Sequence, residues 1–255
     1  VVLQGVYAQY YGLALTTIAS ILLLSRLFDT VTDPIIGYYS DKYFRKSGSR
    51  KLFVFSGSVI FIIGAYLLFV PVLKVTASYT LVCLLLFYLG YTLFNIPHYA
   101  WGSEISRDST SSTQVYTIRA MMMGLGTLVF YALPQTPIFD TPEYTPDVLR
   151  WTVIVASLLL VPAIFLCLRY VPTSCGINGD VGGEEQKDRN FSGPLQDRGL
   201  ISTWNQVKKN KPFLIFLSAF VLWGVGIGSW SGLLFIYISS YLEMGKYFSL
   251  AALIG

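Results

Sequence analysis

Residues 12–39 read GLALTTIASILLLSRLFDTVTDPIIGYY, an apolar run that decides the fold. As a helix rising about 1.5 Å per residue, this run exceeds the ~30 Å hydrocarbon core of a bilayer. It nevertheless contains two carboxylates, Asp29 and Asp33, one helical turn apart near its inner end, and the nearby Arg26. A carboxylate inside a membrane costs roughly 2.5–3.5 kcal/mol even on lenient insertion scales. The pair therefore needs a partner such as a cation, which indicates an ion-coupled membrane transporter.

The composition is that of an integral membrane protein. Hydrophobic residues make up 54% of the chain and charged residues 13%, whereas a soluble domain is typically about 25% charged. The sequence has a single histidine and neither an HExxH zinc motif nor a GxxxxGK(S/T) phosphate-binding loop. Its three cysteines lack metal-ligand spacing. We therefore expect no enzyme, no cofactor and no nucleic-acid partner, but a lipid bilayer around the chain.

Several runs are long enough and apolar enough to cross a bilayer as helices. The predicted spans are 12–39, 52–73, 78–104, 114–134, 150–171 and 213–241, and a further run begins near Tyr247. The expected fold class is all-α and polytopic.

The links between these spans differ in charge. Residues 40–51 and 172–212 are rich in lysine and arginine, whereas residues 135–149 carry three acids and no basic residue. The positive-inside rule places the basic links in the cytoplasm and the acidic link outside, so residue 1 is expected to be extracytoplasmic. Five spans before the long link predict a missing upstream helix, and the abrupt end at Gly255 predicts a missing C-terminal part. The alternative is a natural protein of six or seven spans.

Four stretches occur in an order that is specific to one family. They are RLFDTVTDPIIGYYSDKYFRKSGSRKLF (26–53), FNIPHYAWGSEISRD (94–108), VYTIRAMMMGLG (115–126) and NKPF (210–213). Together they resemble the glycoside–pentoside–hexuronide:cation symporters, the melibiose-permease-like branch of the major facilitator superfamily. Lysolipid-transporting relatives share the same signature, so the resemblance leaves the solute class open.

The resemblance implies an incomplete major facilitator fold, without the first helix and most of the C-terminal bundle. Residues 1–171 are then the N-terminal transmembrane bundle with helices 2–6. Residues 172–212 are a cytoplasmic linker, and residues 213–255 are helix 7 and the beginning of helix 8.

The acids on the first predicted span are candidate cation ligands. Asp29 and Asp33 are spaced i, i+4 and share one helix face, and their mutual repulsion favours a proton or small cation between them. Thr32 and Thr92 offer hydroxyl oxygens. In the resembled family the matching acids form the cation site, but its asparagine before the second acid is Thr32 here. This difference leaves H⁺ open beside Na⁺ at Asp29 and Asp33. The alternative is a structural bridge between Asp29 and Arg26.

Four other residues are candidates for binding the solute. Asn95 stands where the sugar-transporting relative has a substrate-binding aspartate, and Arg119 where the family places a substrate-binding arginine. The same resemblance favours Trp101 near the solute. Tyr91 is expected there because it lies near the stripe that Thr92 and Asn95, spaced i, i+3, can share on one helix face. The alternatives are a helix–helix hydrogen bond for Asn95, an ion pair of Arg119 with one of the two acids, and an interfacial anchor for Trp101.

His98 allows two interpretations. An imidazole titrates near neutrality and can relay protons, but a lone intramembrane histidine is more often a hydrogen-bonding or packing residue.

The charged residues of the inner links resemble the superfamily's inner-loop motif. The expected gating residues are Asp41, Arg45, Arg50, Glu104 and Arg107. They are predicted to form an exposed cytoplasmic latch that stabilises one conformation of alternating access. An exposed pair contributes only about 0–1 kcal/mol, so its role concerns gating more than stability.

These observations predict a secondary transporter of the plasma (inner) membrane. A gradient of H⁺ or Na⁺ would drive symport of a small polar solute, most simply a sugar or glycoside, by alternating access. The alternatives are a lysolipid or other amphiphile transporter of the same fold and a non-transporting membrane binding protein.

Overall fold

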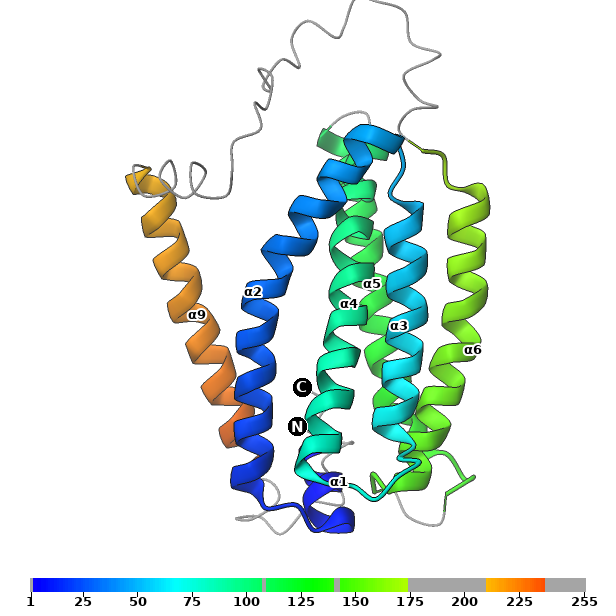
Figure 1. Ribbon diagram of the computed structural model, residues 1–255, viewed down its shortest axis with the longest axis vertical. Coiled ribbons are helices and arrows are strands. Elements are labelled where there is room, and N and C mark those ends of the chain that lie inside the picture. Colours follow the sequence, from blue (N-terminus) through cyan, green and yellow to red (C-terminus); the bar gives the residue numbers. More distant parts are fainter. Residues whose placement is uncertain (1, 107–108, 140–142, 174–209, 237–255) are drawn as a thin grey trace, which may run out of the picture. The chain divides into compact units, whose positions relative to one another are not determined.

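The computed structural model describes residues 2–106, 109–139, 143–173 and 210–236 (Figure 1). The described residues fall into two units, of which the first reaches from residue 2 to residue 173 and the second from 210 to 236. Each unit is described by itself. All regular structure in these residues is helical, and six of the helices are long and apolar enough to cross a membrane. The predicted all-α, polytopic fold class is therefore confirmed.

Each predicted span corresponds to a helix, but several helix ends differ from the predicted ones. Their bounds are α1 Val2–Tyr11, α2 Leu15–Ser47, α3 Lys51–Phe69, α4 Ala77–Ile105, α5 Ser109–Ala132 and α6 Pro146–Tyr170 in the first unit, with a short 3₁₀ turn at Leu133–Gln135, and α9 Lys211–Ile236 in the second. The short helix α1 was not predicted. Most of the predicted linker and the predicted start of helix 8 lie outside the described residues.

Helix α2 is longer than its apolar run. Instead of ending near residue 39, it continues through the polar stretch that was predicted as a link and ends at Ser47. The helix has no glycine after Gly37. Gly48, the residue that follows its end, adopts the left-handed conformation (φ 66°) and donates its backbone N–H to the Phe44 carbonyl at 2.7 Å. The link to α3 shrinks to residues 48–50. Asp29 and Asp33 consequently lie near the middle of a helix, not near its inner end.

A proline follows the second acid within α2. Pro34 has no backbone N–H, so the helix cannot complete the hydrogen bond to the carbonyl of Thr30. Such a gap is tolerated in membrane helices and is a common place for bending. Figure 1 shows that α2 is bent along its length.

The helices of the first unit contact one another near both of their ends. Near one end, a buried cluster connects α1 to α4 and contains Tyr7, Ile18, Ile21, Leu68, Cys83 and Leu84. The Tyr7 hydroxyl there donates to the Leu68 carbonyl, and the Tyr79 hydroxyl donates to the Leu67 carbonyl at 2.6 Å. Near the other end, charged residues around the α2–α3 link make the connections described below.

Helices α3 and α4 approach each other most closely, and Figure 1 shows them side by side. Glycines make this approach possible. A Cβ placed on Gly64 would lie 2.8 Å from the Phe87 backbone of α4, and one placed on Gly57 or Gly90 would overlap the backbone of the facing helix. Small residues commonly bring membrane helices together in this way.

Gly90→Ala tests this packing. We expect it to lower the unfolding free energy by about 2 kcal/mol, within the range for overpacked interiors, because backbone atoms of Phe61 cannot turn away as a side chain would. The measurement is the melting temperature of the full-length protein in detergent. Gly124→Ala is the matched control, since no atom lies within 4 Å of a Cβ at that position. Equal melting temperatures for the two variants would contradict the close approach.

Candidate cation, solute and gating sites

The two acids of α2 have different environments. Asp33 is exposed, and its Oδ1 accepts a hydrogen bond from the Thr92 hydroxyl of α4 at 2.9 Å. Thr92 itself is buried, with 4% of its surface exposed. The predicted pair of Asp33 and Thr92 is thus brought together across two helices.

Asp29 is only partly satisfied by its neighbour. Arg26 Nη1 lies 3.4 Å from Asp29 Oδ2, while the Arg26 side chain is 68% exposed and its guanidinium lies 4.8 Å from the centroid of the Tyr88 ring. The other carboxylate oxygen, Asp29 Oδ1, is buried and has no hydrogen-bond partner in the described part of the chain. The long contact with Arg26 therefore leaves one buried carboxylate oxygen unpaired among the described residues.

Thr32 is oriented toward its own helix. Its hydroxyl donates to the carbonyl of Phe28 at 3.0 Å and lies 3.4 Å from the carbonyl of Asp29. A threonine oxygen retains lone pairs while donating, so the predicted ligand role stays a prediction. Among the described residues there is no group of three or more His, Cys, Asp or Glu that could hold a metal ion. A cation at this place would have the Asp29 and Asp33 carboxylates and neutral oxygens as its ligands.

A second polar cluster surrounds Arg119 of α5. Its Nη2 donates to Asn95 Oδ1 at 2.6 Å, its Nη1 contacts His98 Nδ1, and its Cζ lies 3.6 Å from the centroid of the Tyr99 ring. Asn95, His98 and Tyr99 all belong to α4. The guanidinium is therefore fixed against α4 by two hydrogen bonds and one cation–π contact, and it pairs with neither acid of α2.

The contact with Arg119 determines which ring nitrogen of His98 carries the proton. An arginine side chain only donates hydrogen bonds, so His98 Nδ1 must accept, and its proton then resides on Nε2. The ring also stacks on Phe94, with centroids 5.3 Å apart. This environment agrees with the hydrogen-bonding and packing interpretation of His98. The sequence alone did not identify it as a neighbour of Arg119.

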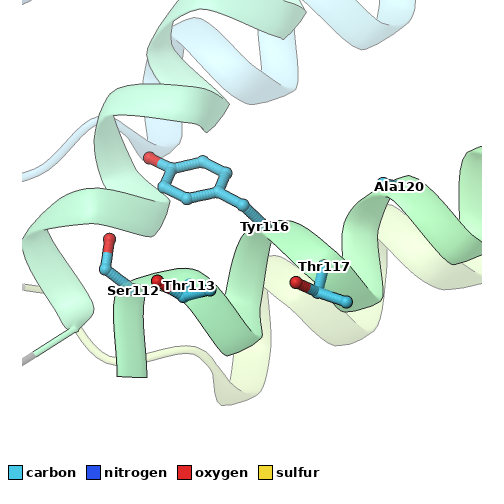
Figure 2. Close-up of a pocket in the computed structure, with 5 residues that line it drawn as sticks. All are labelled: Ser112, Thr113, Tyr116, Thr117 and Ala120. Atoms are coloured by element: carbon cyan, nitrogen blue, oxygen red, sulfur yellow. The ribbon is translucent and has the colours of Figure 1, made fainter. Parts of the chain in front are cut away.

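Tyrosines extend this cluster along α5. The Tyr116 hydroxyl donates to the Tyr99 carbonyl at 3.0 Å, and the two rings stack with centroids 5.9 Å apart. Figure 2 shows Tyr116 pointing from α5 toward α4, beside an open hollow. The hollow is lined by Ser112, Thr113, Tyr116, Thr117 and Ala120. Tyr116 was missed in the sequence, where its position three residues before Arg119 was the available signal.

Two predicted solute contacts have other neighbours. Trp101 is 2% exposed, its indole N–H donates to the Pro172 carbonyl at 3.0 Å, and the Lys51 Nζ lies 5.8 Å from its ring centroid. Its indole is therefore enclosed by the protein, and its predicted role near the solute stays a prediction. Tyr91 is 44% exposed, and its ring packs near Phe61 of α3.

Arg50 is the centre of the predicted latch, but the latch is not exposed as expected. Only 6% of the Arg50 side chain is exposed. Its Nη2 lies 2.7 Å from Asp41 Oδ1 and 2.8 Å from Glu104 Oε1, its Nε donates to the same Glu104 oxygen at 2.9 Å, and its Nη1 donates to Ser40 Oγ at 2.8 Å. The residue joins the ends of α2 and α4 from the short α2–α3 link. The exposed latch expected from the sequence is wrong in this respect, because Arg50 is held among Ser40, Asp41 and Glu104 where the ends of α2, α3 and α4 pack together.

Electrostatics keep Arg50 charged in this position. Burial disfavours the charged guanidinium, but hydrogen bonds to Glu104 and Asp41 and the negative charges of both acids outweigh it, and the pKa of Arg50 is raised above its ordinary value. The second oxygen of the glutamate, Glu104 Oε2, is buried without a hydrogen-bond partner in the described part of the chain. Glu104 thus depends on Arg50 for its neutralisation.

The remaining gating candidates lie apart from Arg50. Arg45 is exposed in the last turn of α2, and the described structure gives it no ion pair. Arg107 lies outside the described residues. On the same end of the unit, the Lys51 ammonium donates to the Leu168 carbonyl of α6 at 2.8 Å.

The sequence matches the family described as MFS/sugar transport protein over residues 1–255. Together with the spanning helices, this match shows that the chain belongs to that family and is a multi-pass integral membrane protein. The recognition from four stretches of sequence is confirmed.

Curated relatives with similar sequences are named as symporters. "Uncharacterized symporter YjmB" of Bacillus subtilis (strain 168) is 27% identical over 145 residues, which cover 54% of this chain and 31% of the relative. "Uncharacterized symporter YnaJ" of the same organism is 23% identical over 244 residues, covering 92% of this chain and 49% of the relative. "Putative glycoside/cation symporter YagG" of Escherichia coli (strain K12) is 28% identical over 137 residues, covering 52% and 30%.

The chain spans at most about half the length of these relatives. No solved structure matches it.

Proposed function

We propose that this chain forms the cation-binding part of a secondary active symporter. The observation that carries the proposal is the pair of acids on α2. Asp29 holds a buried carboxylate oxygen without a hydrogen-bond partner among the described residues, and Asp33, one turn further, is positioned by Thr92. An unpartnered carboxylate oxygen in a buried place is costly, and a bound Na⁺, Li⁺ or H⁺ relieves that cost.

The coupled solute is a sugar or glycoside in this proposal. Arg119 and Asn95 supply its first contacts, since a guanidinium and an amide both hydrogen-bond to oxygen groups. The name of the relative YagG, a glycoside/cation symporter, supports this solute class. Because α4 carries both Thr92 and Asn95, three residues apart, a movement of this one helix affects both sites.

The cluster around Arg50 serves as the latch of alternating access. It ties α2 to α4 near one end of the unit, so it must loosen when these helices separate. The excess of lysine and arginine in residues 40–51 and 172–212 supports a cytoplasmic location for this end by the positive-inside rule. The inner (plasma) membrane is the proposed location, in agreement with the name of the relative "Inner membrane symporter YicJ" of Escherichia coli (strain K12).

Uptake by proteoliposomes tests the proposed activity. The full-length protein is reconstituted, and radiolabelled methyl glycosides of neutral hexoses, pentoses and hexuronic acids are supplied under an inward Na⁺ gradient or pH gradient. We expect accumulation of at least one of them, and collapse of the gradient with an ionophore should abolish it. No accumulation of any of these solutes would contradict a sugar symporter, and uptake of a fluorescent lysolipid instead would favour an amphiphile transporter.

Thr92→Val tests the link between α2 and α4. Valine keeps the shape but removes the hydroxyl that positions Asp33, so the apparent cation affinity should fall about tenfold, which corresponds to about 1.4 kcal/mol. The affinity is read from the melting temperature of the full-length protein against Na⁺ concentration and pH. Thr80→Val is the matched control, because the buried Thr80 hydroxyl of the same helix donates to the Thr76 carbonyl one turn away. Equal affinities in both variants would remove Thr92 from the site.

A further inference from the structure

A groove lies between α3 and α6, which Figure 1 shows side by side in the first unit. It has a volume of about 710 Å³ and is lined by hydrophobic side chains of both helices, among them the exposed Ile63, Ile154 and Leu158. Among the lining residues, Tyr66 and Ser157 have polar side chains. The groove is therefore apolar and open to its surroundings, and none of its lining residues is a cation, solute or gating candidate.

The surfaces of α3 and α6 around the groove are those of helices in contact with lipid. Helix α3 has no charged residue after Lys51, and α6 has none between Arg150 and Arg169. Their exposed side chains in these stretches are mostly large and apolar. The charged candidates for cation and solute belong to α2 and α5 instead. Because a charged side chain is costly in hydrocarbon and an apolar one is not, the groove opens toward lipid chains.

Two arginines mark the depth of α6 in the membrane. Arg150 and Arg169 enclose its apolar run and lie about 28 Å apart along the helix at ~1.5 Å per residue, close to the ~30 Å thickness of a hydrocarbon core. Each is followed by an exposed aromatic residue, Trp151 or Tyr170, of the kind that is enriched at membrane interfaces. Arg150 therefore lies at the headgroup level of one leaflet.

The groove is one leaflet deep. Val153, Ser157 and Val161 of its lining follow Arg150 at intervals of three to four residues and share one face of α6 with it. From Arg150 to Val161 the helix rises about 16 Å, and half of a ~30 Å hydrocarbon core is about 15 Å. On α3, the lining residue Tyr66 belongs to the last turn, at the same end of the unit. A lipid chain of one leaflet fits this depth, with its headgroup beside Arg150.

The polar groups at the mouth of the groove are available to a headgroup. Arg150 and Tyr66 are exposed, and neither makes a hydrogen bond or an ion pair with another described residue, the nearby acid Asp147 included. A guanidinium binds a phosphate through two parallel, charge-assisted hydrogen bonds, and a tyrosine hydroxyl can donate a further one. A headgroup with a net negative charge gains most from this arginine, because a quaternary ammonium group in the headgroup offsets the phosphate charge.

We propose that the groove between α3 and α6 binds a phospholipid with a net negative charge. One acyl chain lies in the groove, and the phosphate lies at Arg150 with Tyr66 beside it. The lipid is a bound component that bridges α3 and α6 and is not the transported solute.

Filling the groove identifies the lipid that it holds. Ser157→Phe places a ring among the lining residues, whereas Ala156→Phe adds the same ring at the adjacent exposed residue, outside the lining. Native mass spectrometry of the full-length protein in detergent with dioleoylphosphatidylglycerol counts the bound lipids. We expect Ser157→Phe to bind one lipid fewer than wild type and Ala156→Phe to bind the same number. Similar melting temperatures of the two variants without lipid would show that both are folded.

The headgroup is tested by competition. The full-length protein is mixed with equal amounts of dioleoylphosphatidylglycerol and dioleoylphosphatidylcholine, and the lipid that Ser157→Phe displaces is identified by its mass. We expect it to favour phosphatidylglycerol about fivefold, the gain for one basic residue at an anionic lipid surface. Arg150→Gln should remove this preference. Arg169→Gln should keep it, because the groove does not extend to the last two turns of α6.

Three results would overturn the proposal. The first is an equal lipid count for wild type and Ser157→Phe, which would mean that no lipid occupies the groove. The second is a displaced lipid without preference between the two headgroups, or with a preference that Arg150→Gln leaves intact. The third is a wild-type dimer that Ser157→Phe dissociates without loss of lipid, which would make a second copy of the chain the occupant.

Discussion

Arg50→Gln is expected to lower the unfolding free energy of the full-length protein by about 3 kcal/mol. Arg50 is buried and pairs with two acids at once, and its removal leaves Glu104, whose side chain is 19% exposed, without a counterion among the described residues. Breaking a buried ion pair from one side costs about 3–5 kcal/mol, and we place this one at the lower end because Asp41 is 60% exposed. The melting temperature in detergent measures the effect.

Two further variants make the interpretation specific. Arg45→Gln removes the same charge from an exposed residue of the same end and should change the melting temperature little. Adding Glu104→Gln to Arg50→Gln removes the unpaired carboxylate and should restore much of the loss, as expected for two residues in direct contact. If the Arg45 and Arg50 variants melt alike, the buried latch is contradicted.

Asp33→Asn is expected to abolish concentrative uptake. Asparagine keeps the shape and can still accept from Thr92, but it removes the charge that attracts the coupling cation. Proteoliposomes with the variant should equilibrate a solute that the wild type accumulates, so that the inside concentration equals the outside one. Solute exchange at equal cation concentrations on both sides should continue, because that exchange requires no net cation movement.

Asp147→Asn is the matched control for this variant. Asp147 is an exposed acid in the first turn of α6, and its neutralisation should leave accumulation unchanged. Accumulation by Asp33→Asn at the wild-type level would show that coupling does not pass through this carboxylate.

Apolar length was sufficient to predict the spanning helices but not their ends. The span beginning at residue 12 was predicted to stop where its apolar residues stop. Helix α2 instead continues through polar residues, whose backbone hydrogen bonds maintain a helix equally well, and ends at Ser47, where Gly48 adopts the left-handed conformation. Helix α5 likewise includes polar residues from Ser109 onward, ahead of the predicted start near residue 114. Hydrophobicity predicts which residues lie in the hydrocarbon core of the membrane, whereas local hydrogen bonding decides where a helix ends.

The candidate residues could be found from the sequence, but their partners could not. The i, i+4 spacing put Asp29 and Asp33 on one face, and Thr92 was expected beside them. The hydrogen bonds of Arg119 to His98 and Asn95 depend on how α5 is rotated against α4. By charge alone, either acid of α2 was an equally good partner for Arg119. Burial of Arg50 likewise follows from tertiary packing of three helix ends, which spacing does not encode.

The central claim is that Asp29 and Asp33 bind the coupling cation. Its most direct test is the thermal stability of the intact protein in detergent across Na⁺, Li⁺ and pH, beside Asp33→Asn. A cation that binds only the folded state at about 100 times its dissociation constant stabilises by about 2.7 kcal/mol. We predict a rise in melting temperature with Na⁺ or Li⁺, or with lower pH for proton coupling, and its loss in the variant. An identical response of wild type and variant under every condition would leave the acids as a structural bridge and contradict the symporter mechanism.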